Sequence, residues 1–163
     1  MFPKRRSVRI VGYDYAQPGA YFVTLCVAGR RSMFGRVVDG VVILSPLGTI
    51  AEQALIWLSE RYSHIRIPEY AVMPNHLHAI VSWDAPSDPP KSLGALVNAY
   101  KATASGRMRR HLGDQGATIW QRGLYEHIIE DEAEFYEKAE YIRHNAETWE
   151  WDHENPDAVR SPK

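Results

Sequence analysis

The order of strand-like and helix-like segments is the feature that most constrains what this chain can fold into. Short runs rich in β-branched and aromatic residues alternate with three longer segments of helical periodicity. The expected order is β-ββ-α-β-β-α-β-α. Few helices and short strands favour an α+β fold, in which helices pack against one mainly antiparallel sheet. Neither a repeat nor a long linker divides the 163 residues, so we expect one domain over residues 1–163.

Turn and capping residues place the individual segments. The run "AYFVTLCVAG" from Ala20 predicts a strand, and Asp39-Gly40 between two apolar runs predicts a hairpin. Residues 65–74 and 77–83 predict two paired strands, or one long strand bent at Pro74-Asn75, and residues 118–130 predict another strand. The residues expected to cap the three helices are Ser45, Ser92 and Asp131.

Composition bounds the class of protein. Hydrophobic residues make up 45% and charged residues 24%, which is typical of a soluble globular protein. The single cysteine, Cys26, excludes an internal disulfide and fits the reducing cytoplasm of a bacterium, where we expect it to be a buried apolar residue. No apolar run reaches the roughly 18 residues of a membrane span, so we expect none.

Charge is distributed unevenly along the chain. Residues 1–110 carry fourteen Lys and Arg against seven Asp and Glu, whereas residues 111–163 carry five against thirteen. A basic body with an acidic last third could hold a polyanion on one side, although ordinary solvated faces give the same pattern. The chain is expected to begin with a flexible basic arm and to end, after Trp151, in a polar and frayed tail.

Two histidines interrupt an apolar run in "MPNHLHAIV". On a strand His76 and His78 project from the same face, about 7 Å apart along the chain, because side chains alternate between the two faces. Two imidazoles so placed can bind one divalent cation. Taken alone, the pair is a weak signal that more often means two half-buried structural histidines, and a metal site needs a third ligand and a reacting group.

The last predicted helix offers both groups. In "AEYIRHNAETW", Tyr141 and Asn145 stand four residues apart and so share one side of a helix. Both fall beside the apolar stripe that contains Ala139 and Ile142. Tyr141 is then either a functional residue or an amphipathic tyrosine at the edge of the core.

These motifs together resemble a known family. "MPNHLHAIV", "IWQRGLYEHII" and "AEYIRHN" are similar to segments of the single-tyrosine HUH transposases of bacterial insertion sequences, in particular the REP-associated tyrosine transposase branch. "YDYAQPGAYFVTLCVAGRRSMFG" resembles the family's N-terminal strand, and "LGALVNAYKATAS" resembles its middle helix. The resemblance covers about residues 10–150. It implies a ferredoxin-like antiparallel sheet with helices packed on one face, and a homodimer.

The resemblance also implies roles for particular residues. Tyr141 matches the catalytic nucleophile, and His76, His78 and Asn145 match ligands of a divalent metal, for which Mg or Mn is expected. Tyr141 would attack single-stranded DNA, at a hairpin, and form a 5′-phosphotyrosine intermediate that permits strand transfer without ATP. Lys138 and His144 lie within a turn of Tyr141 and are candidates to assist with its proton, unless they are simply exposed helix residues.

Basic and polar residues supply candidates for DNA binding. Each cluster is also consistent with ordinary surface solubility. The candidates are Arg5 and Arg6 in the N-terminal arm, Lys101, Arg107, Arg109 and Arg110 on or after the middle helix, and Gln121 and Arg122 beside Trp120.

Three functions are consistent with these residues. The leading interpretation is a metal-dependent DNA endonuclease and strand transferase of the transposase type. A catalytically silent DNA-binding protein of the same fold is the first alternative. A metal hydrolase that uses the two histidines and a water, with Tyr141 incidental, is the second, and it would survive substitution of Tyr141 by Phe.

Overall fold

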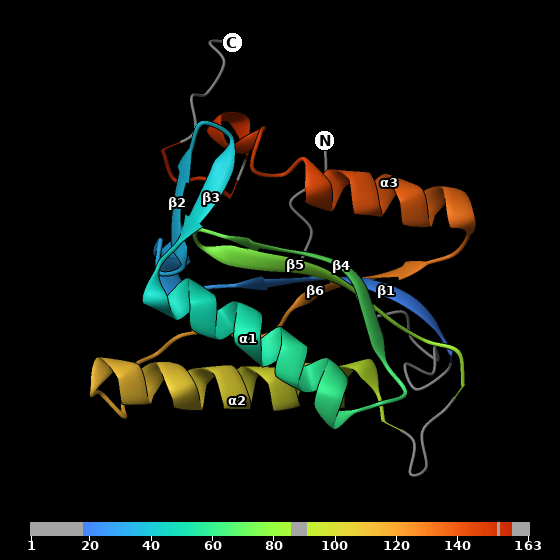
Figure 1. The fold of residues 1–163 in the computed structure, drawn as a ribbon, viewed down its shortest axis with the longest axis horizontal. Coiled ribbons are helices and arrows are strands. Elements are labelled where there is room, and N and C mark those ends of the chain that lie inside the picture. Colours follow the sequence, from blue (N-terminus) through green and yellow to red (C-terminus); the bar gives the residue numbers. More distant parts are fainter. Residues whose placement is uncertain (1–17, 86–90, 153, 158–163) are drawn as a thin grey trace.

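Four antiparallel strands form the central sheet of the computed structural model, in the order β4-β5-β1-β6 (Figure 1). The structure describes residues 18–85, 91–152 and 154–157. The sheet strands are β1 (Gly19–Cys26), β4 (Arg66–Met73), β5 (His76–Trp83) and β6 (Tyr125–Ile129). With helices in the connections β1–β4 and β5–β6, this order is that of a ferredoxin-like fold. The α+β class predicted from the sequence is therefore confirmed.

Three helices and one hairpin complete the fold. Ser45, Ser92 and Asp131 each cap a helix by accepting a hydrogen bond from a backbone N–H three residues on, as predicted. The predicted hairpin turns at Asp39 and Gly40, both of which have positive φ. The helices are α1 (Pro46–Arg61), α2 (Leu93–Leu112) and α3 (Glu132–Arg143), and the hairpin strands are β2 (Gly35–Val38) and β3 (Val41–Leu44).

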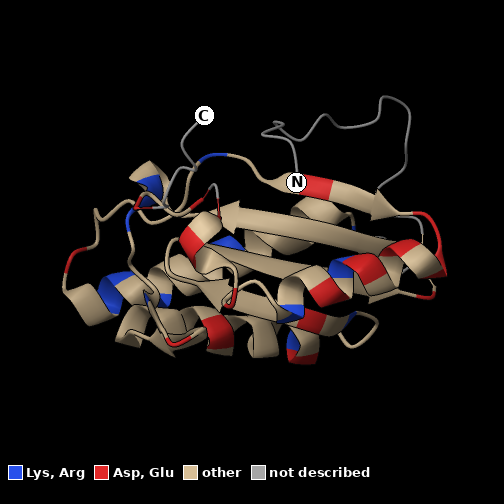
Figure 2. Ribbon diagram, turned by 90° about the horizontal axis from the view of Figure 1, so that it is seen from above, with Lys and Arg blue, Asp and Glu red and all other residues tan. Residues whose placement is uncertain are grey.

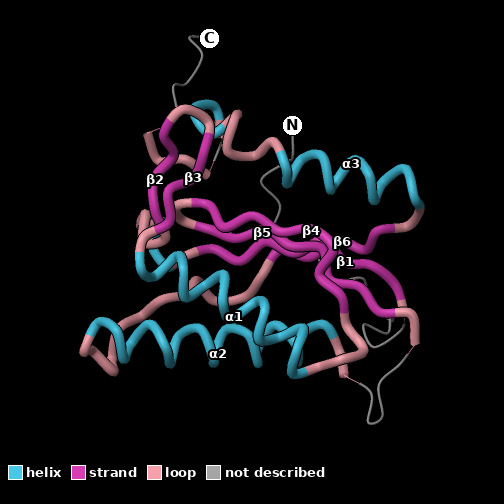
Figure 3. The backbone as a smooth tube through the Cα atoms, viewed as in Figure 1, coloured by secondary structure: helices cyan, strands magenta, loops and turns pink. Residues whose placement is uncertain are grey.

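The helices lie on both faces of the sheet, which corrects the expectation that all would pack on one. Figures 1 and 3 show α1 and α2 on one side and α3 on the other. Strand alternation explains the division, because Tyr21, Val23 and Leu25 of β1 join the large core under α1 and α2. Phe22 faces the opposite way and packs in a smaller cluster with Ala139 and Ile142 of α3. The smaller cluster adjoins the candidate site.

Two strand predictions are refined by the structure. Strands β4 and β5 are an antiparallel pair joined at Pro74-Asn75, so the alternative of one bent strand was wrong. Of the strand predicted over residues 118–130, only Tyr125–Ile129 forms a strand, β6. Before it, Trp120 makes a single bridge to Val27. In the described part of the chain, no helix is long and apolar enough to cross a membrane.

Candidate functional site

The two histidines open strand β5 and face α3. His76 and His78 share this face with Ile80, a member of the small cluster beneath α3. The side chains are 0% and 4% exposed. The ring of His78 stacks on Phe22 at 5.3 Å between centroids, and the ring of His76 lies 5.9 Å from that of Trp149. The pair is therefore more deeply buried than the half-buried histidines considered from the sequence.

Asn75 determines which tautomer the neutral ring of His76 adopts. Its amide Nδ2 donates to the carbonyl oxygens of Glu154 at 2.6 Å and Arg30 at 3.4 Å, so Oδ1 faces His76 Nδ1 at 2.8 Å. Because a carbonyl oxygen can only accept, the proton of the neutral ring lies on Nδ1. His76 Nε2 thus carries the lone pair that a metal would need.

The rings of His78 and His76 face each other through their Nε2 atoms. The two Nε2 atoms are 3.0 Å apart, and Thr24 Oγ1 lies 2.8 Å from His78 Nδ1. As His76 Nε2 accepts, His78 Nε2 donates here and its Nδ1 accepts from the hydroxyl. The Thr24 hydroxyl can also accept, which leaves His78 able to adopt the tautomer of a metal ligand. The separation suits two nitrogens of one coordination sphere, where metal–nitrogen bonds are about 2.0–2.1 Å.

Tyr141 lies in the last turn of α3, against the histidines. Its ring makes edge contacts with His78 at 5.2 Å and with Phe22 at 6.1 Å between centroids. Burial, followed by the carboxylates of Asp152 and Glu154, raises the pKa of the phenol, whereas a hydrogen bond with Asn145 acts in the opposite direction. The phenol is therefore neutral at neutral pH and has to lose its proton to become a nucleophile.

Asn145 reaches the site from beyond the end of the helix. Asn145 was predicted to share one side of this helix with Tyr141, but α3 stops at Arg143, so Asn145 lies beyond the helix, although it still bonds with Tyr141. Its side chain is 1% exposed, and Nδ2 donates to Asp152 Oδ2 at 2.9 Å. Among the described residues, its buried Oδ1 has no hydrogen-bond partner. An unsatisfied buried carbonyl oxygen, on a residue that bonds with Tyr141, is a ligand type that a divalent cation can use.

The donor set is mixed. No group of three or more His, Cys, Asp or Glu among the described residues is placed to hold a metal ion. The predicted ligand set does not form such a group, because its third member is the amide oxygen of Asn145. Burial and the charge of Glu154 raise the pKa of the Cys26 thiol to about 11, so this thiol is protonated at neutral pH.

The two candidate assisting residues have different environments. Lys138 is 6% exposed, and its Nζ lies 5.3 Å from the centroid of the Phe22 ring. Burial lowers the pKa of Lys138, with a partial offset from Glu137 and Glu134. The interpretation as an exposed helix residue was therefore wrong for Lys138. His144 is exposed and bonds to Glu140 and Glu147, as expected of a surface residue.

The predicted DNA-binding residues at the end of α2 lie across the sheet from Tyr141, and two of the predicted residues hold the chain together. Arg107, Arg109 and Arg110 lie at the end of α2, beneath the opposite face of the sheet (Figure 1). Arg109 Nε donates to the Ala117 carbonyl, and Lys101 Nζ donates to the carbonyls of Gln121 and Gly123. Gln121 and Arg122 are exposed, whereas Arg5 and Arg6 lie outside the described residues. Figure 2 shows basic and acidic residues interspersed over the upper face.

Sequence reasoning missed Asp152, together with the contact of Trp149. The segment after Trp151 was expected to fray, yet Asp152 is 8% exposed and accepts hydrogen bonds from Asn145 and from the backbone of Glu154. The sequence signal for this turn was an aspartate, whose side chain can accept a hydrogen bond from the backbone N–H two residues later. Its bond to Asn145 depends on tertiary packing and left no pattern in the sequence.

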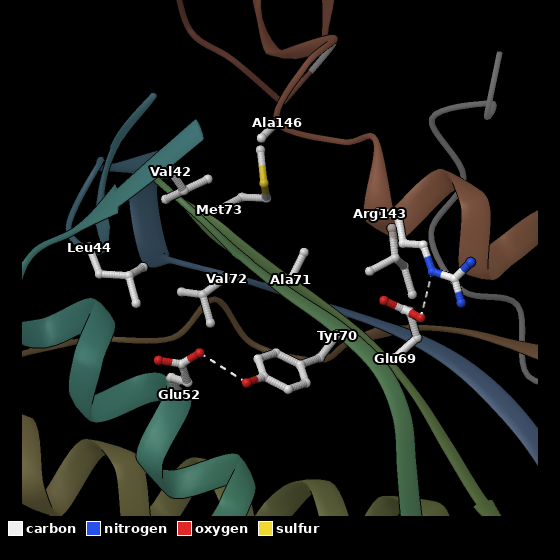
Figure 4. Close-up of a pocket in the computed structure, with 11 residues that line it drawn as sticks. Val42, Leu44, Glu52, Glu69, Tyr70, Ala71, Val72, Met73, Arg143 and Ala146 are labelled. Atoms are coloured by element: carbon white, nitrogen blue, oxygen red, sulfur yellow. Dashed lines mark hydrogen bonds and ion pairs between the residues drawn. The ribbon is translucent and has the colours of Figure 1, made fainter. Parts of the chain in front are cut away.

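A pocket of about 390 Å³ lies beside this site, between the hairpin, α1, β4 and the end of α3 (Figure 4). Its walls are largely apolar, with Glu52 and Glu69 among the polar residues. Glu52 accepts from the Tyr70 hydroxyl, and Glu69 accepts from Arg143. Two carboxylates make this pocket a poor place for a phosphate, so we keep it separate from the candidate site.

Comparison with known proteins identifies the family. Residues 21–145 match the family described as "Transposase IS200 like". An uncharacterized protein of Haemophilus influenzae is 31% identical over 166 residues, covering 91% of each chain. The chain therefore belongs to the IS200-like transposase family, as its motifs suggested, and is a DNA-processing enzyme of the transposase type.

Two solved structures share the fold. One is a REP-associated tyrosine transposase bound to a REP hairpin, with a TM-score of 0.64 at 21% identity over 93% of this chain and 76% of that chain. The other, a candidate transposase from Deinococcus radiodurans R1, has a TM-score of 0.52 at 16% identity over 83% of this chain and 95% of that chain.

Proposed function

We propose that this chain is a metal-dependent endonuclease and strand transferase for single-stranded DNA, with Tyr141 as its nucleophile. The observation that carries the proposal is the meeting of three elements in one buried site. The Tyr141 ring contacts His78, the two histidine Nε2 atoms lie 3.0 Å apart, and Asn145 leaves a buried amide oxygen without a partner. A site built only for packing would not concentrate polar groups in this way.

The reaction exchanges one phosphate ester for another. Tyr141 Oη attacks the phosphorus of a phosphodiester, the bond from Tyr141 oxygen to phosphorus forms, and the bond to the 3′ oxygen breaks. The products are a 5′-phosphotyrosine link and a 3′-hydroxyl. The phenol loses a proton and the departing 3′ oxygen gains one. Attack by another 3′-hydroxyl reverses the step and joins two strands.

Residues of the chain prepare the phenol for this step. Its raised pKa means that the proton leaves during the attack rather than before it. Lys138 stands one turn earlier on α3, its amine lies over the Phe22 ring that Tyr141 also contacts, and burial lowers the pKa of this amine. We therefore assign Lys138 to proton transfer and leave His144 without a catalytic role.

His76, His78 and Asn145 would hold the divalent metal, for which we propose Mg or Mn. When bound, such an ion neutralises charge that develops on the phosphate. Asn75 and Thr24 keep the ring nitrogens of the two histidines oriented. The amide oxygen favours a hard cation, because oxygen ligands suit Mg and Mn.

The DNA substrate is proposed to be a hairpin with single-stranded flanks, supported by the hairpin in the structurally similar transposase. The enzyme would act in the bacterial cytoplasm, where such DNA lies. One domain over residues 1–163 and a homodimer also belong to the proposal. The molar mass from light scattering tests the dimer, since a monomer mass at working concentration would contradict it.

The decisive experiment compares wild type with Tyr141→Phe on labelled hairpin DNA taken from beside the gene, with Mg or Mn, on a denaturing gel. We expect a protein–DNA adduct in wild type only, lost when EDTA is added. Cleavage that persists in Tyr141→Phe would favour the hydrolase. Binding without cleavage by either protein would favour the silent DNA-binding protein. Tyr136→Phe, an exposed tyrosine on the same helix, is the matched control and should form the adduct normally.

A further inference from the structure

The segment that follows α3 folds back onto the candidate metal ligands. Asp152 ends the short helix Trp149–Trp151 and is nearly buried, at 8% exposure. Its Oδ2 accepts from Asn145 Nδ2 at 2.9 Å, and its Oδ1 accepts from the Glu154 N–H at 2.8 Å. One carboxylate oxygen thus anchors Asp152 to its own loop, and the other points at the amide of Asn145.

This contact decides which way the Asn145 amide faces. The two ends of an amide have nearly the same shape, so packing alone does not distinguish them. A carboxylate only accepts, so the amide nitrogen has to face Asp152 and the oxygen has to face away. That oxygen is the buried Oδ1 that lacks a partner among the described residues. Without Asp152, the amide could turn and present its NH₂ group where a metal needs an oxygen.

The same segment also supports His76. The Glu154 carbonyl accepts from Asn75 Nδ2 at 2.6 Å, and Asn75 Oδ1 accepts from His76 Nδ1 at 2.8 Å. The loop that positions Asp152 is therefore joined by hydrogen bonds to the base of β5. This link fixes the carboxylate relative to the strand that carries the histidines.

We propose that Asp152 is a positioning residue, which holds the Asn145 amide so that Oδ1 is available as the third metal ligand. The inference rests on the proposed function, because it requires that His76, His78 and Asn145 bind a divalent cation. Hydrogen bonds to a ligand from its neighbours commonly change metal affinity by about 10–100-fold. Asp152 acts on the metal site through Asn145, in addition to its effect on the pKa of Tyr141.

The test measures metal binding without DNA or catalysis. Full-length protein is titrated with Mn²⁺, and free Mn²⁺ is followed by electron paramagnetic resonance. We expect Asp152→Ala to weaken Mn²⁺ binding by about tenfold or more. Asp152→Asn, which keeps one carbonyl oxygen, should fall between Asp152→Ala and wild type. Glu150→Ala removes an exposed carboxylate from the same short helix and should bind Mn²⁺ as wild type does.

A double-mutant cycle separates positioning from a general effect on folding. If Asp152 acts through Asn145, then adding Asp152→Ala to Asn145→Ala should change Mn²⁺ affinity by less than about twofold, because the group it positions is gone. An equal loss in both backgrounds would overturn the proposal. Circular dichroism melts check the fold, and Asp152→Asn carries the test if Asp152→Ala does not fold.

The outcomes distinguish failure of the metal site from failure of the positioning role of Asp152. If wild type binds Mn²⁺ and His76→Ala abolishes binding, the metal site stands. Wild-type affinity in Asp152→Ala would then overturn the role of Asp152 alone. If wild type binds no Mn²⁺, or if His76→Ala binds it equally well, the metal site and the positioning role both fail.

Discussion

The Nδ1 atom of His78 is hydrogen-bonded to a hydroxyl group from the neighbouring strand. Thr24 on β1 lies opposite His78 on β5, and its Oγ1 is 2.8 Å from Nδ1. Thr24→Val has nearly the same shape but no hydroxyl. It should weaken Mn²⁺ binding by about tenfold, because the ring loses the partner that holds its orientation. Thr24→Ser keeps the hydroxyl and should stay within about threefold of wild type. Equal losses in both variants would point to packing instead.

Lys138 allows a separate prediction about the proton. Lys138→Met keeps an unbranched chain against Phe22 and removes the buried amine. Formation of the adduct should slow by about 10²-fold, the contribution expected of general acid–base catalysis, with less change in melting temperature than a cavity mutation would produce. Single-turnover gels with saturating DNA measure the rate. Lys138→Arg keeps the charge but holds its proton, so recovery of the rate in that variant would contradict proton transfer.

The site residues differ in how far the sequence could reveal them. His76 and His78 were predictable, because strand alternation alone puts them on one face. Tyr141 stood out only through its spacing to Asn145 and the family resemblance. Asp152 was missed and Lys138 was misjudged, because each depends on what another segment brings over it. Local patterns record which side of an element a residue occupies, but they do not record what covers that side.

At the scale of elements, the caps and turns were the reliable signals. Ser45, Ser92, Asp131 and the Asp39-Gly40 turn act through hydrogen bonds or φ angles within a few residues, so they hold wherever the element packs. Strand β6 was predicted too long. Lys101 binds the carbonyls of Gln121 and Gly123 just before it, which occupies backbone that would otherwise pair with a strand. That contact joins distant segments and has no local signature.

Two glycines in helices should respond in opposite ways to replacement by alanine. A Cβ at Gly48, in the first turn of α1, would lie 2.9 Å from the carbonyl carbon of Phe34, whose oxygen accepts from Ser45 N–H. Gly48→Ala should therefore destabilise the protein by about 1–3 kcal/mol. Gly106 in α2 has nothing within 4 Å of such a Cβ, so Gly106→Ala should stabilise by about 0.5–1 kcal/mol. Chemical denaturation measures both, and a stable Gly48→Ala would show that the hairpin can move away from α1.

At the scale of the whole molecule, the topology brings the ends of α2 and α3 to one end of the sheet, on opposite faces (Figure 1). His76 pairs with Met73 at this end, whereas Arg66 pairs with Ser82 at the other. The basic end of α2 and the Tyr141 site are thus separated by the edge of the sheet and the loop that holds Gln121 and Arg122. DNA that contacts both Tyr141 and the end of α2 has to pass around an edge of the sheet, because the two lie on opposite faces. This separation could not be predicted from the sequence, because it depends on which face of the sheet each helix covers.

This arrangement predicts how DNA binding depends on salt. Each Lys or Arg that contacts a phosphate adds about one to the slope of log affinity against log salt concentration. Arg110→Ala and Arg107→Ala should each lower that slope by about one, while the rate of adduct formation at saturating DNA stays near the wild-type rate. Fluorescence anisotropy with a labelled hairpin at several salt concentrations measures the slope. Arg66→Ala, at the far end of the sheet, removes the same charge and should leave the slope unchanged. If all three variants lower the slope equally, the effect is one of net charge, and the DNA does not follow the path from Tyr141 to α2.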